Sequence, residues 1–266
     1  MTRDRDSLGK MLAVSFKNPA FWGYSTWLDI VVRYRRASLG LWWIFVPPLL
    51  YMLGLGYFYS RLAQRNMLDY IPHLGLGFML YRLVTTVVIE STSVLPNHSG
   101  FILDGKVRLT DFVLRVIFKG VFYFVCSMIV LVPLLLFSPQ FHLSGILPSL
   151  LGLAFVLANL MWMAGVISLF GARYPDTHEF MGNVFLLGFV ITPILWDKSA
   201  APAHTIHGLL MRLNPAFHMI EVVRAPLLGE LIEPASQLII FFSAVFGWML
   251  WGWAFRRYSR FVPLWV

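Results

Sequence analysis

The sequence predicts an all-α integral membrane protein. Of its 266 residues, 58% are hydrophobic and only 13% are charged, whereas ordinary soluble domains carry roughly 25% charged residues. Six apolar stretches approach or exceed the length of about 20 residues that a helix needs to cross the hydrocarbon core. The basic residues flank these stretches and form no continuous stripe, so the net charge of +8 indicates membrane topology rather than nucleic-acid binding.

The six apolar stretches are predicted transmembrane helices, and they organise residues 1–266 as a single transmembrane domain. They lie at residues 39–59, 71–93, 116–137, 143–171, 180–196 and 238–255. Lys and Arg are concentrated on one side of this arrangement, which predicts that both termini are cytoplasmic. Residues 1–38 are then a cytoplasmic N-terminus, 39–196 hold spans one to five, 197–237 are external, 238–255 form span six, and 256–266 are a cytoplasmic tail. No cleavable signal peptide is evident, because the first long apolar run starts near residue 39.

Two further segments have the period of amphipathic helices that do not span. Between residues 24 and 36, apolar side chains share one face and charged side chains the other, with Arg35 on the apolar side. This pattern predicts an interface helix that lies on the cytoplasmic surface of the membrane before the first span. Residues 214–227 carry an apolar stripe beside a polar one that holds His218, Glu221 and Arg224. They predict a short external or partly re-entrant helix between spans five and six.

The sequence offers no catalytic or cofactor site of a recognisable kind. Gly100, Gly105 and Lys106 have the spacing of a phosphate-binding loop, but Val107 replaces the Ser or Thr that would hold magnesium. The single cysteine, Cys126, excludes a disulfide framework. We therefore expect no cofactor and no metal, and a transport subunit rather than an enzyme. Any ATP-driven step needs a separate ATPase subunit.

Arg82 is the most informative single residue, because it falls at the middle of the second predicted span. A charged side chain at that depth is costly and normally faces a cavity or a partner. One interpretation is structural, with Glu90 as a candidate ion-pair partner or with bonds to backbone carbonyls. The other is functional, with the guanidinium lining a conduit and available to phosphate or sugar hydroxyls.

Aromatic residues are abundant around the first two predicted spans. Most fit the belts of Trp and Tyr that mark membrane interfaces. Rings that face a conduit would suit a polysaccharide, because the C–H faces of sugars stack on aromatic rings. The candidates for such a lining are Tyr51, Phe58, Tyr59 and Tyr81.

The segment of residues 96–115 is the longest predicted cytoplasmic loop after the N-terminus. It mixes charged and apolar side chains, which is typical of a segment that docks into a partner; a plain solvated loop is the alternative. The candidate coupling residues are Phe101, Asp104, Lys106, Arg108 and Asp111.

Three stretches, in order along the chain, resemble the membrane subunits of type-2 ABC exporters for O-antigen and related polysaccharides. The first is RYRRASLGLWW at residues 33–43, followed by Pro47. The second is RYPD at residues 173–176 with TPILW at 192–196. The third is NPAFHMIE at residues 214–221 with RAPLLG at 224–229. The stretch KVRLTD at residues 106–111 is equally similar to capsule-exporting relatives.

This resemblance implies a homodimer in the bacterial inner membrane with two cytoplasmic ABC ATPase subunits. The N-terminal helix and the loop around Phe101 would contact those ATPases. The substrate would be a polysaccharide on a polyprenyl pyrophosphate carrier, moved from the cytoplasmic to the periplasmic side. Arg33, Arg35 and Arg36 lie where the pyrophosphate headgroup would approach, although anchoring to anionic membrane lipid explains them equally well.

Other functions remain open at this point. The exported molecule could be a capsular polysaccharide, teichoic acid, or a small lipid or drug. A function of another class is a membrane-embedded transferase for lipid-linked sugars, which would use Asp176, His178 and Glu179 at the cytoplasmic surface.

Overall fold

The computed structural model describes residues 7–62, 64 and 66–266, and every regular element within these ranges is helical. Four helices are long and apolar enough to cross a membrane: α5 (Met67–Val94), α7 (Leu109–Leu136), α8 (Ile146–Arg173) and α12 (Pro234–Tyr258). The first three have 28 residues each, or about 42 Å of helix. The all-α membrane fold is confirmed, and these helices correspond to the second, third, fourth and sixth predicted spans.

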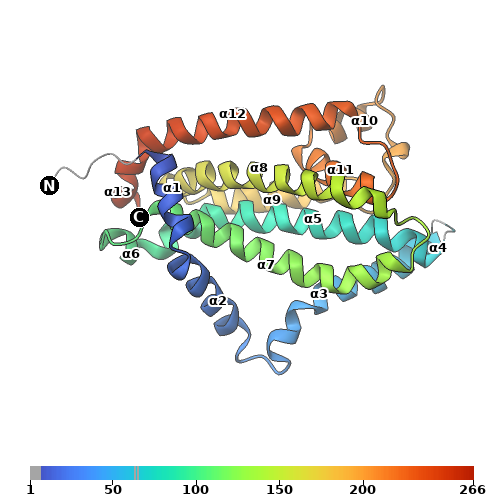
Figure 1. Ribbon diagram of the computed structural model, residues 1–266, viewed down its shortest axis with the longest axis horizontal. Coiled ribbons are helices and arrows are strands. Elements are labelled where there is room, and N and C mark those ends of the chain that lie inside the picture. Colours follow the sequence, from blue (N-terminus) through green and yellow to red (C-terminus); the bar gives the residue numbers. More distant parts are fainter. Residues whose placement is uncertain (1–6, 63, 65) are drawn as a thin grey trace.

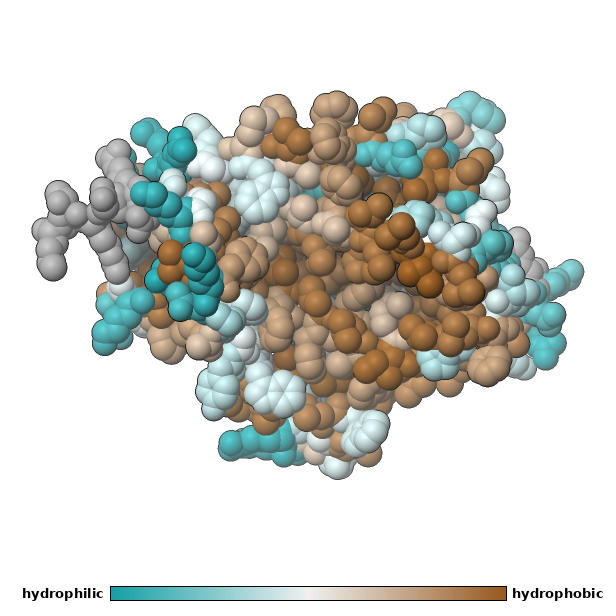
Figure 2. Space-filling view, in the orientation of Figure 1, coloured by the Kyte–Doolittle hydropathy of each residue, from teal (hydrophilic) through white to brown (hydrophobic). Residues whose placement is uncertain are grey.

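Helix α5 is the centre of the bundle. Of its most apolar stretch 72% is buried, against 33% in each of the other three long helices. Helices α7 and α8 pack lengthwise against α5, and α12 packs on α8 (Figure 1). Ile129, Leu147 and Phe246 project from α7, α8 and α12 as exposed apolar side chains. Figure 2 shows a hydrophobic band across the bundle with hydrophilic residues at both ends, which is the surface that lipid contact requires.

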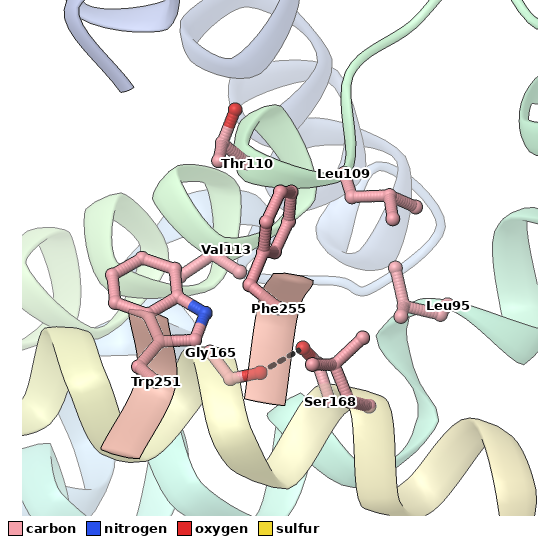
Figure 3. A pocket seen from close by; sticks show the side chains of 9 residues that line it. Leu95, Leu109, Thr110, Val113, Gly165, Ser168, Trp251 and Phe255 are labelled. Carbon is pink, nitrogen blue, oxygen red and sulfur yellow. Dashed lines mark hydrogen bonds between the residues drawn. The ribbon is translucent and has the colours of Figure 1, made fainter. Parts of the chain in front are cut away.

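Helices α8 and α12 interlock through two glycine–tryptophan pairs. A Cβ on Gly165 would lie 2.0 Å from the Trp251 ring, and a Cβ on Gly247 would lie 2.1 Å from the Trp162 ring. Trp251 and Gly165 face each other in Figure 3, beside the hydrogen bond that Ser168 donates to the Gly165 carbonyl. Small residues let the two backbones approach closely, which is the usual basis of helix packing where lipid removes the hydrophobic driving force.

The first predicted span, residues 39–59, is helical but irregular. It consists of a 3₁₀ turn η1 (Gly40–Ile44), α3 (Val46–Leu49), a π-helical turn η2 (Leu50–Leu55) and α4 (Gly56–Leu62). Pro47 and Pro48 lack the N–H groups that regular α-helical bonding needs, so the chain cannot form one uniform helix here. That this irregular helical segment, from η1 to α4, crosses the membrane stays a prediction.

The fifth predicted span, residues 180–196, is shorter than expected. Helix α9 (Thr177–Ile191) has 15 residues, about 22 Å, and it ends before Pro193. The Thr192 hydroxyl donates to the Gly188 carbonyl at 2.6 Å and helps to close the last turn. Proline at 193 disfavours helical geometry at residue 192 and removes a donor. Residues 192–196 therefore leave the helix, and a crossing by α9 stays a prediction.

Two helices lie between α9 and α12: α10 (Ile206–Leu213) and α11 (Pro215–Leu227), after a 3₁₀ turn η5 (Lys198–Ala200). The Asn214 side chain caps α11 by accepting from the Ala216 N–H at 3.0 Å. A short helix was predicted here. The structure adds that both of its stripes are buried, because α11 packs against α5, α8 and α12.

The N-terminal helices α1 (Leu8–Lys17) and α2 (Ala20–Tyr34) pack on α7. At the other end of the chain, α12 leads through a 3₁₀ turn η6 (Ser259–Phe261) into α13 (Val262–Trp265). Helices α1 and α13 lie at the same end of the bundle, together with α6 (Ser99–Leu103) (Figure 1). We call this the terminal end, and the end that holds α4, α10 and α11 the opposite end.

The glycine–tryptophan packing gives a direct test of the fold. Replacing Gly165 by Ala places a methyl group inside the Trp251 ring, which cannot move without disturbing α12. We expect a loss of about 1–3 kcal/mol in stability, measured by thermal unfolding of the purified protein in detergent. Gly252→Ala is the matched control, because a Cβ at Gly252 meets nothing within 4 Å. Equal melting temperatures for the two variants would contradict this packing.

Candidate functional site

A polar cavity opens between α2, α5 and α7 at the terminal end of the bundle. Its volume is about 250 Å³. Helix α2 supplies one wall, the C-terminal end of α5 a second, and the first turns of α7 the third. The lining residues are Asp29, Arg33, Glu90, Ser93, Val94, Asn97, His98, Arg115, Val116 and Lys119.

Two ion pairs hold the walls of this cavity together. Arg115 of α7, which is buried, pairs with Asp29 of α2. Lys119 of α7 pairs with Glu90 of α5, with Nζ and Oε1 2.7 Å apart. Arg33 also lines the cavity but has no carboxylate partner among the described residues. The cavity therefore carries one positive charge in excess.

The pKa shifts of the residues around the cavity preserve this excess positive charge near pH 7. The Arg33 side chain lies beside the Tyr123 hydroxyl, and this interaction raises the pKa of Arg33 above its ordinary value. Burial lowers the pKa of the His98 imidazole, and the charges of Arg115 and Lys119 act in the same direction. His98 is thus neutral near pH 7 while Arg33 stays charged. The cavity offers a permanent cation to an anionic group of a ligand.

Helix α2 is the helix that the amphipathic pattern predicted. Thr26 and Ile30 are buried against the bundle, while the predicted apolar face, with Tyr24 and Trp27, is exposed. Such a face suits contact with lipid, although its position in a membrane interface stays a prediction. Arg35 and Arg36 follow α2 in an exposed turn, and hydrophilic atoms cover the turn between α2 and α3 in Figure 2.

Arg82 lies on α5 beside α7. Its guanidinium carbon stands 5.5 Å from the centre of the Tyr123 ring. Glu90, the partner considered from the sequence, pairs with Lys119 instead. The reason is that Arg82 and Glu90 lie eight residues apart on one helix and point in different directions, whereas Lys119 lies directly opposite Glu90 on α7.

The structure does not bring the four candidate conduit aromatics into one cluster. Tyr51 stacks on Phe78, with ring centroids 3.6 Å apart. Tyr81 is only 5% exposed, and its hydroxyl donates to the Phe185 carbonyl. Phe58 projects outward from α4, and Tyr59 meets it edge to face at 5.4 Å. That these rings line a conduit for a glycan stays a prediction. Such a conduit would need a second protein surface facing α4.

The predicted cytoplasmic loop at residues 96–115 is mostly helical. It contains the 3₁₀ turn η3 (Pro96–His98), α6 and the first turns of α7. Asp111 accepts from the Arg108 N–H at 3.2 Å and stabilises the start of α7. Helix α7 therefore begins at Leu109, before the predicted end of the loop at residue 115. Only 4% of Asp111 is exposed, so its carboxylate is not presented to a partner.

The remaining coupling candidates form a protruding surface. Half of the Phe101 side chain is exposed in the middle of α6, and its ring also meets that of Phe21 edge to face at 5.8 Å. Asp104 and Lys106 are exposed in the turn that follows, and the Arg108 side chain is partly exposed. Their contact with an ATPase stays a prediction, but their exposure at the terminal end makes it feasible.

The sequence did not predict the cluster of buried charges at the opposite end. Arg224 and Glu221 of α11 are 1% and 0% exposed. Arg224 donates to the Pro193 carbonyl at 2.6 Å, and Glu221 accepts from Lys198 at 2.6 Å. Burial alone would lower the pKa of Lys198, but its bonds to Glu221 and Glu230 outweigh burial and raise it. The polar stripe of α11 was visible in the sequence; its partners were not, because they lie far along the chain.

No protein-family model matches the chain. The chain is 23% identical over 233 residues to the O-antigen export system permease protein RfbA of Myxococcus xanthus, and the match covers 84% of this chain and 86% of that protein. The chain resembles an O-antigen export permease. The resemblance inferred from three short stretches is thereby confirmed over most of both sequences.

The similarity to a permease, together with the four long apolar helices, makes this chain a multi-pass membrane protein. It favours a transport subunit over an enzyme. Because the match covers 84% of this chain, it includes most of the helical bundle.

The ion pair between α2 and α7 can be tested by removing its exposed partner. Asp29→Asn leaves the buried Arg115 guanidinium without a carboxylate, so we expect a loss of about 1–3 kcal/mol and faster proteolysis of the segment before α3. Thermal unfolding and limited proteolysis measure the two effects. Asp104→Asn, at an exposed acid with no ion pair among the described residues, should change neither. A stable Asp29→Asn protein would show that α2 does not depend on the pair.

Proposed function

We propose that this chain is the transmembrane subunit of an ATP-driven ABC exporter for lipid-linked polysaccharide of the O-antigen type. The observation that carries the proposal is the match to an O-antigen export permease along 84% of the chain. The cationic cavity at one end of an apolar bundle supports it, because a glycan carried on polyprenyl pyrophosphate presents an anionic headgroup at the membrane surface.

The proposed topology has six spans with both termini in the cytoplasm of a bacterium, across its inner membrane. The irregular rod from η1 to α4 would be the first span and α9 the fifth. Helices α1 and α13 at one end of the bundle are in keeping with an even number of crossings. The terminal end would face the cytoplasm, since Lys and Arg concentrate in the segments assigned to it.

In this function the headgroup would reach the cavity from the cytoplasmic leaflet. Arg33 lines the cavity, and Arg35 and Arg36 are exposed beside it. Guanidinium groups bind phosphate oxygens through paired hydrogen bonds. The glycan would then pass through a conduit between two copies of the chain, where the exposed ring of Phe58 is available for stacking together with Tyr51, Tyr59 and Tyr81.

ATP hydrolysis would come from two copies of a separate cytoplasmic ABC ATPase. The segment from Gly100 to Lys106 folds as α6 and a turn after it, and no strand precedes it within the described residues. It does not form a phosphate-binding loop, which needs a strand before it and a helix after it. The exposed side chains of α6 would instead dock on the ATPase and transmit its closure to α5 and α7.

Export in cells tests the headgroup assignment. In a strain that lacks its own permease, Arg33→Gln should lower surface glycan roughly tenfold, as expected for the loss of one charge-assisted bond to phosphate. Lipid-linked glycan should accumulate inside. Arg61→Gln, at the opposite end of the bundle, is the control and should export normally. Surface glycan is quantified by gel and antibody, with membrane levels of the permease measured in parallel. Normal export by Arg33→Gln would remove Arg33 from the mechanism.

Docking of the ATPase is tested by co-purification. Phe101→Ala removes the half-exposed ring of α6, so the tagged permease should retain several-fold less ATPase. Its melting temperature is measured in parallel, because the ring also contacts Phe21. Leu264→Ala removes an exposed apolar side chain from α13 at the same end and should retain the ATPase fully. Equal recovery from both variants would place the docking surface elsewhere.

A further inference from the structure

Arg82 has no carboxylate partner among the residues that the structure describes. One terminal nitrogen of its guanidinium is buried and has no hydrogen-bond partner. The two acids nearest along the cavity are already engaged, Glu90 with Lys119 and Asp29 with Arg115. The groups that interact electrostatically with Arg82 are phenols and a thiol: Tyr34, Tyr123, Tyr51 and Cys126. None of these neutralises a positive charge.

The surroundings of Arg82 contain a second unsatisfied group. The Tyr123 hydroxyl is buried and has no partner of full hydrogen-bond geometry among the described residues; the Arg33 and Tyr34 side chains are the polar groups that lie beside it. Buried donors without partners are rare in folded proteins, and each one calls for an explanation such as a missing ligand. Here two of them, one cationic, face the same small region between α5 and α7.

This region lies next to the cavity, toward the middle of the bundle. Tyr123 follows Lys119 by four residues, so it lies on the same face of α7 about one helical turn deeper. Arg33 reaches Tyr123 from the cavity side, and Arg82 stands over the Tyr123 ring from α5. Two guanidinium groups thus flank one tyrosine, and neither has a carboxylate partner within the part of the chain that the structure describes.

An unpaired guanidinium in apolar surroundings destabilises a protein, and a purely structural site would pair it or replace it by an apolar side chain. An anion that enters the site would provide the missing interactions. The ligand chemistry follows from the donors: two guanidinium forks and a phenol O–H match a group with several anionic oxygens, which a pyrophosphate has and a single carboxylate does not.

We propose that Arg82, Arg33 and the Tyr123 hydroxyl form a binding site for the pyrophosphate of the lipid carrier, one helical turn beyond the cavity. This inference rests on the proposed function, because it takes the carrier as the substrate. It assigns Arg82 to the headgroup and not to the glycan or to a structural ion pair. The cavity admits the headgroup, and the Arg82 site holds it inside the bundle.

Binding to the purified chain tests the site without ATPase or glycan. The protein is placed in nanodiscs of neutral phosphatidylcholine, and inorganic pyrophosphate and farnesyl pyrophosphate are titrated, with affinity and melting temperature as readouts. Wild type should bind both and be stabilised by them. Arg82→Met should bind at least tenfold more weakly, and its melting temperature without ligand should rise, because the unpaired charge is gone.

Arg61→Met is the matched control, because Arg61 also stands 5.5 Å over a tyrosine ring, that of Tyr57, but at the opposite end of the bundle. It should leave affinity unchanged. Tyr123→Phe removes only the hydroxyl and should weaken binding several-fold without loss of stability. This second variant keeps the test decisive if Arg82→Met does not fold.

Three results would overturn the site. One is wild-type affinity in both Arg82→Met and Tyr123→Phe. Another is a lower melting temperature of Arg82→Met with unchanged affinity, which would make Arg82 structural. The third is displacement of farnesyl pyrophosphate by phosphatidylglycerol at equal concentration, which would assign the site to bilayer lipid. Failure of export by the wild-type chain in cells is a separate result, and it alone would count against the proposed function.

Discussion

The buried guanidinium of Arg224 determines how the opposite end of the bundle is built. In apolar surroundings it must have hydrogen-bond acceptors, and it takes the Pro193 carbonyl. That carbonyl is available only because α9 stops at Ile191. Two further carbonyls of this segment are used in the same way, since Tyr70 donates to that of Leu195 and His73 lies 3.2 Å from that of Trp196. The hydrogen bonds to the carbonyls that follow α9 therefore hold the short α9, the buried α11 and the polar first turns of α5 together.

The two ends of the bundle use charge differently. At the opposite end, the buried ions have partners on other segments, as in the bond between Lys198 and Glu221. This ties α11 to its neighbours. At the terminal end, Arg33 in the cavity and Arg82 about one helical turn deeper have no ion-pair partner among the described residues. Proteins that depart from full polar satisfaction do so mainly at functional sites. Both ends keep buried atoms without a hydrogen-bond partner, since Arg224 Nε and Nη2 and Glu221 Oε2 also lack one. The difference is that Arg224 has the Glu221 carboxylate 4.0 Å away, whereas Arg82 has no acid beside it among the described residues.

Apolar length predicted the spans well where nothing interrupted the helix. Helices α5, α7, α8 and α12 follow the predicted stretches because about 20 apolar residues in a row satisfy both lipid and backbone. The pattern was less informative where proline occurs. Pro47 and Pro48 leave the first stretch a mixture of helix types, and Pro193 ends the fifth. Hydropathy depends on side chains and takes no account of the backbone N–H that proline lacks. The regular helix predicted for both stretches was therefore too long.

The sequence by itself indicated a helical membrane protein that resembles polysaccharide-export permeases. It also showed that the segment from Gly100 to Lys106 lacks the Ser or Thr that would follow in a phosphate-binding loop. These properties depend on composition and on local spacing. Only the tertiary structure decided which charges meet. It paired Glu90 with Lys119, left Arg82 unpaired over Tyr123, buried Asp111 and turned Glu221 inward. The physical reason is that an ion pair depends on distances between helices that pack side by side. Residues far apart along the chain become neighbours only when the bundle closes.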